Sequence, residues 1–344
     1  PRGAKGDIPL QYRSLGQSPL RVSSLCLGAM MFADQTSRDE SAAIVAHARE
    51  HGVNFIDTAD VYTKGGSETL LGELLRGQRH EWVLATKLGN AMSAQPNEGG
   101  YSRSWMARAI EASLQRLQTE HVDILYLHRD FHGLQLEEPL RALEAMLRDG
   151  KIRYWGLSNF SGWRTSEAVH LARALGMPGP VVQQPCYNLL NRMPEADVLP
   201  VCAHHGIGVV PYSPIARGVL TGKYAPGEPP APESRAGRGD KRMGQTEFRE
   251  ASLQIANTLK THVETRGVTL AQFATAWVLA HPEVSSVIAG PRTLQQWQDY
   301  LPALDYRVST EDEALVDSLV APGHPSTPGY TDPNHPVRSR RPRG

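Results

Sequence analysis

Residues 122–158 contain two short apolar runs, Val122-Asp123-Ile124-Leu125-Tyr126-Leu127-His128 and Ile152-Arg153-Tyr154-Trp155-Gly156-Leu157-Ser158. A segment with helical spacing of its apolar residues separates the two runs. Two buried strands joined by a helix form the repeating unit of a parallel sheet. This stretch therefore predicts one strand-helix-strand unit.

The same alternation extends in both directions from this stretch. Six further runs lie at residues 24–28, 53–57, 82–87, 181–184, 207–212 and 286–290. The first seven runs follow one another at intervals of about 25 to 35 residues, which fits one strand, one helix and two short loops. A barrel of eight such units needs roughly 250 residues, and the chain has 344. We therefore predict an α/β fold of the (β/α)8 TIM-barrel type.

Three segments exceed the minimum for such a barrel. Residues 12–22 hold two short extended pieces around a turn, which predicts an N-terminal hairpin that plugs the barrel. The interval between the seventh and eighth runs contains a Pro-rich stretch at 225–232 and a charged, Gly-rich stretch up to Gly244, which indicates a long loop lying over another part of the protein. We predict one barrel domain over residues 1–320 and a Pro/Gly-rich tail over 321–344, which ends with Arg338, Arg340, Arg341 and Arg343.

Composition limits the classes of function. Hydrophobic residues make up 40% of the chain and charged residues 21%, as expected of a globular protein. Lys+Arg and Asp+Glu both number 36, so no net charge favours a nucleic acid or an anionic membrane as partner. No transmembrane stretch or signal-type N-terminus is seen, and Cys26, Cys186 and Cys202 lack the spacing of a zinc site or disulfide framework. We expect a cytoplasmic protein without a metal, either monomeric or a homo-oligomer.

Reactive side chains end several of the predicted strands. Asp57, Lys87 and His128 end three successive runs, and Tyr62 follows the first of them. The carboxyl ends of barrel strands form the active-site face. A tyrosine phenol has a pKa of about 10, which a neighbouring ammonium lowers. We therefore predict that Lys87 adjusts Tyr62, that Asp57 holds the charge of Lys87, and that His128 orients a carbonyl oxygen.

Seven separated motifs in this order resemble the aldo-keto reductase family, and the potassium-channel beta-subunit-like branch within it. The matching stretches are Gly52-Val53-Asn54-Phe55-Ile56-Asp57-Thr58-Ala59-Asp60-Val61-Tyr62, Ala85-Thr86-Lys87, Leu127-His128, Gly150 to Phe160, Gln184-Pro185-Cys186-Tyr187-Asn188-Leu189-Leu190, Pro211-Tyr212-Ser213-Pro214 through Gly222-Lys223-Tyr224, and Gly290-Pro291-Arg292-Thr293. The resemblance covers roughly residues 11–320. It implies a (β/α)8 barrel that binds NADPH without a Rossmann fold, and the chain indeed contains no G-x-G-x-x-G motif.

The resemblance also implies a reaction and its residues. Tyr62 would be the general acid, its pKa depressed by Lys87 and Asp57, and His128 would position the carbonyl of a small-molecule aldehyde or ketone. Hydride transfer from the nicotinamide would then yield an alcohol. The residues that the resemblance assigns to the cofactor are Ser158, Asn159, Gln184 and Tyr212 at the nicotinamide, Ser213, Ile215, Gly218 and Leu220 along the pyrophosphate, and Gly290, Arg292, Gln296 and Asp299 at the adenosine.

Two details follow for the ligands. The forked donors of Arg292 suit a 2′-phosphate and favour NADPH over NADH, and the long loop after the seventh run would fold over the pyrophosphate. The loops at 88–100 and 129–133 are expected to face the substrate, although their composition does not identify it.

Two alternatives to a carbonyl reductase stay open. The chain could be a cofactor-binding regulatory or accessory subunit that resembles the potassium-channel beta subunits, because those proteins can keep the same four residues. It could also act in the opposite direction, as an NADP+-dependent dehydrogenase of a sugar or pyridoxal-type alcohol.

Overall fold

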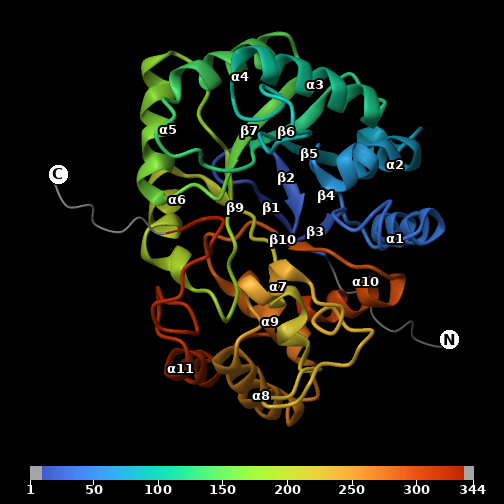
Figure 1. Cartoon of the computed structure of the whole chain (residues 1–344), viewed down its shortest axis with the longest axis vertical. Coiled ribbons are helices and arrows are strands. Elements are labelled where there is room, and N and C mark those ends of the chain that lie inside the picture. The colour runs from blue at the N-terminus through green and yellow to red at the C-terminus, as the bar shows by residue number, and fades with distance from the viewer. Residues whose placement is uncertain (1–9, 337–344) are drawn as a thin grey trace.

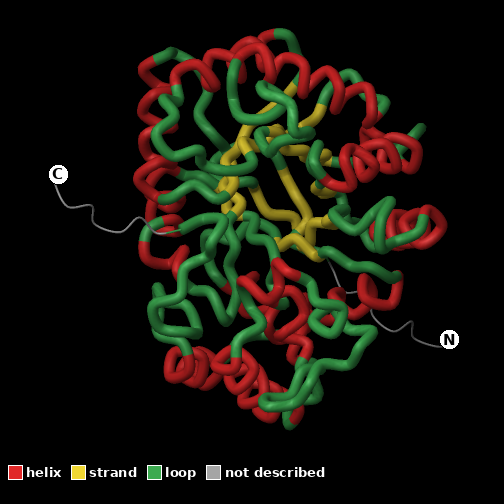
Figure 2. Tube along the Cα trace, viewed as in Figure 1, coloured by secondary structure: helices red, strands yellow, loops and turns green. Residues whose placement is uncertain are grey.

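Eight parallel strands curl into a barrel at the centre of the computed structural model, which describes residues 10–336 (Figures 1 and 2). The strands are β3 (Leu25–Gly28), β4 (Phe55–Asp57), β5 (Val83–Leu88), β6 (Val122–Leu127), β7 (Ile152–Ser158), β8 (Val182–Gln184), β9 (Gly208–Val209) and β10 (Val287–Ala289). They pair in sequence order, and β10 also pairs with β3. The Ile288 amide donates to the Pro211 carbonyl at 3.0 Å, which closes the last seam. The predicted barrel is confirmed.

Alternating side chains along the strands form two separate apolar clusters. One cluster takes Cys26, Phe55, Ile124 and Val182 from different strands and includes Leu15 of the N-terminal segment. The larger cluster joins the other strand positions to the surrounding helices. Burial on both faces explains why the runs are mostly apolar instead of alternating regularly with polar residues.

Helices surround the barrel in Figure 1. They are α1 (Arg38–Glu50), α2 (Gly66–Leu74), α3 (Arg103–Leu117), α4 (Glu137–Arg148), α5 (Gly162–Ala174), α6 (Val198–His205), α7 (Lys241–Gln245), α8 (Glu250–Glu264), α9 (Leu270–Ala280), α10 (Leu294–Tyr300) and α11 (Thr310–Leu319), with 3-10 turns η1 (Tyr62–Gly65), η2 (Arg79–Glu81), η3 (Met193–Ala196), η4 (Ala216–Thr221) and η5 (Leu301–Leu304). Side-chain capping fixes several starts; the Ser37 hydroxyl, for example, accepts from the Glu40 amide at the start of α1. None of the helices in residues 10–336 is long and apolar enough to cross a membrane.

The predicted N-terminal hairpin is also present. β1 (Tyr12–Ser14) and β2 (Arg21–Ser23) pair in antiparallel fashion. Its turn contacts the backbone that enters β9, where the Gln17 amide donates to the Gly206 carbonyl at 2.8 Å. A Cβ atom on Gly16 would lie 2.4 Å from backbone atoms of Gly206 and Gly208. Only glycine permits this close approach, which seats the hairpin at the amino ends of the strands.

The long loop after β9 and the described part of the tail both return to the barrel. Tail residues 321–336 form no helix, as the prolines predict. The Arg249 guanidinium lies 3.7 Å from the centroid of the Tyr330 ring, and Arg242 forms an ion pair with Asp332. This part of the tail is therefore held against the protein; the four arginines at its end lie outside the described residues.

Candidate active site

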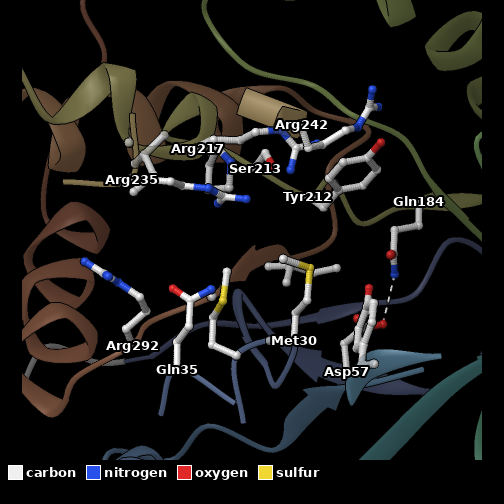
Figure 3. A pocket seen from close by; sticks show the side chains of 18 of the residues that line it. Met30, Gln35, Asp57, Gln184, Tyr212, Ser213, Arg217, Arg235, Arg242 and Arg292 are labelled. Carbon is white, nitrogen blue, oxygen red and sulfur yellow. Dashed lines mark hydrogen bonds between the residues drawn. The ribbon is translucent and has the colours of Figure 1, made fainter. Parts of the chain in front are cut away.

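The carboxyl ends of the strands surround an elongated pocket of about 580 Å³, a size typical of small-molecule sites. Figure 3 shows Arg292 and Gln35 at one end, and Asp57 with Gln184 at the other. Arg217, from the segment after β9, lies in the wall across the pocket from Gln35. The pocket thus runs from α10 to the centre of the barrel.

Lys87 links two of the predicted catalytic residues at the end nearest the barrel axis. Its Nζ atom donates to Asp57 Oδ1 at 2.5 Å, to the Thr58 carbonyl at 2.8 Å and to the Tyr62 hydroxyl at 3.2 Å. Asp57 ends β4, Lys87 lies near the end of the neighbouring β5, and Tyr62 starts η1, the next element after β4. The Lys87 side chain is fully buried. The three oxygen partners offset much of the free-energy cost of burying the ammonium, so Lys87 stays charged.

Burial and charge oppose each other at these three groups. Burial raises the pKa of Asp57, and the Lys87 ammonium acts in the opposite direction. Burial alone lowers the pKa of Lys87, but Asp57 and Tyr62 raise it above its ordinary value. Burial raises the pKa of Tyr62 more than Lys87 lowers it. Lys87 thus acts on Tyr62 in the expected direction, but the net shift is opposite to the expected depression because the phenol is desolvated.

His128 follows β6 and lies against Tyr62. The two rings meet edge to face, with centroids 5.9 Å apart. Burial lowers the pKa of His128 well below its ordinary value, and the positive charges of Lys87 and Arg129 lower it further. The imidazole is therefore neutral near pH 7 and can donate one hydrogen bond. Its buried Nδ1 has no hydrogen-bond partner within residues 10–336.

Four residues expected at the nicotinamide join into one hydrogen-bonded group. The Tyr212 hydroxyl donates to Asn159 Oδ1 at 2.8 Å, and Asn159 Nδ2 donates to Ser158 Oγ at 3.0 Å. The Ser158 hydroxyl donates to the Gln184 carbonyl at 2.9 Å. Gln184 Nε2 donates to Asp57 Oδ2 at 2.9 Å, so this amide supports the second oxygen of the aspartate. These contacts connect the ends of β7 and β8 with Tyr212 and with the cluster of Lys87, Asp57 and Tyr62.

Strained backbone occurs around the pocket. Asn159, Ser213 and Arg217 all line it with positive φ angles of 59°, 57° and 54°. The left-handed conformation is costly for residues with a Cβ atom and persists where the surrounding contacts enforce it. The Asn159 side chain, for example, is held between the His128 carbonyl and Tyr212. Backbone strain of this kind is typical of sites whose side chains are held in place before a ligand binds.

The residues expected along the rest of the cofactor are mostly brought together. Ser213, Ile215, Gly218, Gly290, Arg292, Gln296 and Asp299 all line the pocket. Leu220 does not line it: the side chain is fully buried in the core, and its amide donates to the Ile215 carbonyl at 3.2 Å. Gln296 Oε1 accepts from the Arg292 amide at 2.9 Å, which fixes the start of α10.

Further lining residues were not assigned individually from the sequence. They are Met30, Met31, Gln35, Asn90, Arg129, Arg217, Lys223, Arg235, Arg242, Asn334 and His335, among others. Asn90 and Arg129 fall in the two loops expected to face the substrate. Asn334 and His335 come from the tail, where no local sequence signal points to a site, since their position depends on contacts with Arg129 and Arg242.

Comparisons with known proteins agree with this architecture. The model of the Aldo/keto reductase family matches residues 24–321, and the chain belongs to that family. A probable voltage-gated potassium channel subunit beta of Arabidopsis thaliana is 38% identical over 301 residues, which cover 86% of this chain and 92% of the relative. An uncharacterized oxidoreductase, YrpG, of Bacillus subtilis is 36% identical, with 93% and 99% covered. L-glyceraldehyde 3-phosphate reductase of Escherichia coli is 34% identical, with 91% and 93% covered. The family and these relatives support an oxidoreductase.

Proposed function

We propose that this protein is an NADPH-dependent reductase that converts an aldehyde or ketone into an alcohol. The observation that supports this most is the contact of 3.2 Å between Lys87 Nζ and the Tyr62 hydroxyl, with Asp57 bound to the same ammonium. A phenol beside a buried, charge-balanced ammonium can give up a proton and regain it. His128 lies next to the phenol as a neutral donor.

The pocket fits a nicotinamide dinucleotide at three places. Tyr212 offers an aromatic ring in the pocket wall near Asp57 and Gln184 (Figure 3). Gly290 faces open space where a Cβ atom would project. Arg292 lies at the far end with no ion pair within the described residues and suits a 2′-phosphate. In this proposal Ser158, Asn159 and Gln184 hold the carboxamide side, Ser213, Ile215, Gly218 and the Leu220 segment follow the pyrophosphate, and Gly290, Arg292, Gln296 and Asp299 hold the adenosine end.

The bound cofactor supplies the hydride, and the protein's own residues supply position and a proton. His128 donates a hydrogen bond to the carbonyl oxygen and orients it toward Tyr62. Tyr62 protonates that oxygen as negative charge develops on it, and Lys87 stabilises the resulting phenolate. Asp57 and Gln184 keep Lys87 charged and in place throughout.

The proposal is tested by NADPH consumption against a panel of aldehydes, ketones and sugars. We expect turnover of at least one carbonyl class, and loss of it when the Tyr62 hydroxyl is removed. If every carbonyl compound fails while NADPH binds, the accessory role indicated by the relatives named as potassium channel beta subunits would replace the reductase. If alcohols or sugars are oxidised with NADP+ faster than carbonyls are reduced, the preferred direction would be reversed.

Replacement of Arg292 tests the choice between the two cofactors. We expect Arg292→Gln to weaken NADPH binding about 10-fold, since a hydrogen bond to a charged group contributes about 1.5–3 kcal/mol, and to leave NADH binding nearly unchanged. Quenching of protein fluorescence by each dinucleotide measures both affinities. Arg266→Gln, which changes an arginine outside the pocket lining that pairs with Glu311 and Asp312, is the control. Equal losses for NADPH and NADH would contradict a 2′-phosphate contact.

The remaining expectations belong to the same proposal. All three cysteines are free, which supports a cytoplasmic protein, because disulfides are rare in that compartment. We propose a single barrel domain with the tail applied to it, small-molecule ligands instead of nucleic acid or membrane, and a monomer or homo-oligomer.

A further inference from the structure

Charge balance distinguishes two of the arginines in the pocket wall. Five arginines line the pocket. Three form ion pairs within the protein: Arg217 with Glu247 at 3.0 Å, Arg235 with Asp240 at 2.9 Å, and Arg242 with Asp332. Arg129 and Arg292 form no ion pair within residues 10–336. Arg292 lies at the adenosine end, so Arg129 needs a different anion.

Arg129 lies at the reactive end of the pocket. It directly follows His128, and its guanidinium is close enough to lower the pKa of that imidazole. Arg129 Nη2 donates to the Asn334 carbonyl at 3.2 Å. Its Nε is buried and has no hydrogen-bond partner within the described residues. A buried donor on a cation without a protein acceptor is unfavourable and calls for a partner such as a water molecule or an anion.

The tail completes the wall beside Arg129. Asn334 and His335 both line the pocket, and the ion pair of Asp332 with Arg242 holds this part of the tail. Burial lowers the pKa of His335 to about 4, so this imidazole is neutral near pH 7. Neither tail side chain therefore supplies a negative charge. Arg129 is accompanied by neutral hydrogen-bonding groups, which suits an anionic ligand.

We propose that the carbonyl substrate carries an acidic group, a carboxylate or a phosphate, and that Arg129 binds this group beside Asn334 and His335. The inference rests on the proposed reductase function and specifies its substrate class. Tyr62, His128 and Arg129 all line the pocket, so a single small molecule can place its carbonyl at Tyr62 and His128 and its acid at Arg129. A guanidinium recognises either acid through paired N–H donors.

Matched substrates test this selectivity. The first pair is 4-carboxybenzaldehyde and its methyl ester, and the second is glyceraldehyde 3-phosphate and glyceraldehyde. For each pair the ratio of kcat/KM, acid over neutral, is measured with NADPH. We expect a ratio well above one in the native protein and a fall of about 10-fold or more in Arg129→Met, the effect of losing a hydrogen bond to a charged group. The pair with the larger ratio distinguishes carboxylate from phosphate.

Two further variants separate charge from general damage. Arg129→Lys keeps the charge without the fork and is expected to retain part of the ratio. Arg141→Met removes a half-exposed arginine paired with Glu144 on α4 and should leave the ratio at its native value. An unchanged ratio in Arg129→Met, or a ratio near one for both pairs in the native protein, would overturn the proposed acid site. Turnover of the neutral substrates would still support the reductase.

A binding measurement keeps the two proposals separable if no turnover occurs. Isothermal titration of the NADP+-loaded protein with 4-(hydroxymethyl)benzoate and its methyl ester compares an acid and a neutral alcohol without chemistry. If the native protein binds the acid more tightly than the ester and Arg129→Met removes this difference, the anion site is supported even in a protein without reductase activity. Equal binding of acid and ester would refute it.

Discussion

Tyr62→Phe is expected to lower kcat for carbonyl reduction by about 10²- to 10⁴-fold, the usual contribution of a positioned general acid. The change removes only the hydroxyl that lies 3.2 Å from Lys87 Nζ. Lys87 keeps Asp57 and the Thr58 carbonyl as partners, so the fold and the NADPH affinity should be preserved. Single-turnover rates at saturating NADPH measure the chemical step directly.

Tyr187→Phe provides the matched control for this prediction. Tyr187 is also buried, and its hydroxyl donates to Glu195 at 2.7 Å, but it does not line the pocket. We expect a small loss of stability and a native single-turnover rate. A Tyr62→Phe protein that binds NADPH and turns over at the native rate would show that the proton comes from another group.

Lys87→Met is expected to affect stability as well as activity. It removes the only cation bound to Asp57 among the described residues, and loss of one partner of a buried ion pair costs about 3–5 kcal/mol of unfolding free energy. The deficit should grow as pH rises above about 4, the ordinary pKa of an aspartate. Without Lys87, burial leaves the pKa of folded Asp57 raised, so the folded state holds its proton more tightly and loses stability as pH increases. Urea unfolding at pH 5 and pH 8 measures this difference.

The double variant Lys87→Met with Asp57→Asn separates the two effects. The side-chain oxygen of the introduced asparagine can still accept from Gln184, which donates to Asp57 Oδ2 in the native protein. With no charge left unpaired, we expect the unfolding free energy to recover by about 2 kcal/mol or more relative to the single variant. Reduction should stay as low as in the single variant. Recovery of activity along with stability would contradict a role for Lys87 beyond structure.

Local sequence features predict much of the fold. The strands are short, mostly apolar runs because both of their faces are largely buried, and that pattern is present in consecutive residues such as Leu25 to Gly28. The hairpin turn near Gly16 and the cap at Ser37 are equally local. β9 is shorter than its run, with two residues, since the chain beyond Val209 joins the barrel through isolated hydrogen bonds, such as those from the Val210 amide to the Gln183 carbonyl and from the Ile288 amide to the Pro211 carbonyl.

Local patterns predict the candidate site where its residues end a strand, and the family resemblance adds residues such as Tyr62 and Arg292 that do not. Asp57, Lys87 and His128 occupy such strand ends, and the barrel brings them together because all strands run in one direction. The sequence indicates Arg129 less strongly than these three residues, because it is expected only as part of a loop that faces the substrate. The balance of burial against charge at Tyr62 could not be predicted, because desolvation depends on everything packed around the phenol.

The sequence by itself determined the barrel, its order of strands and the polar residues at the strand ends, since these follow from apolar runs and their spacing. Only the tertiary structure decided which charges are balanced. Asp332 pairs with Arg242, 90 residues away in the chain, and Asn334 meets Arg129 across 205 residues. Such contacts bring the tail to the pocket, and within residues 10–336 they leave Arg129 without an anionic partner. No local pattern encodes them, because they depend on how distant segments pack in three dimensions.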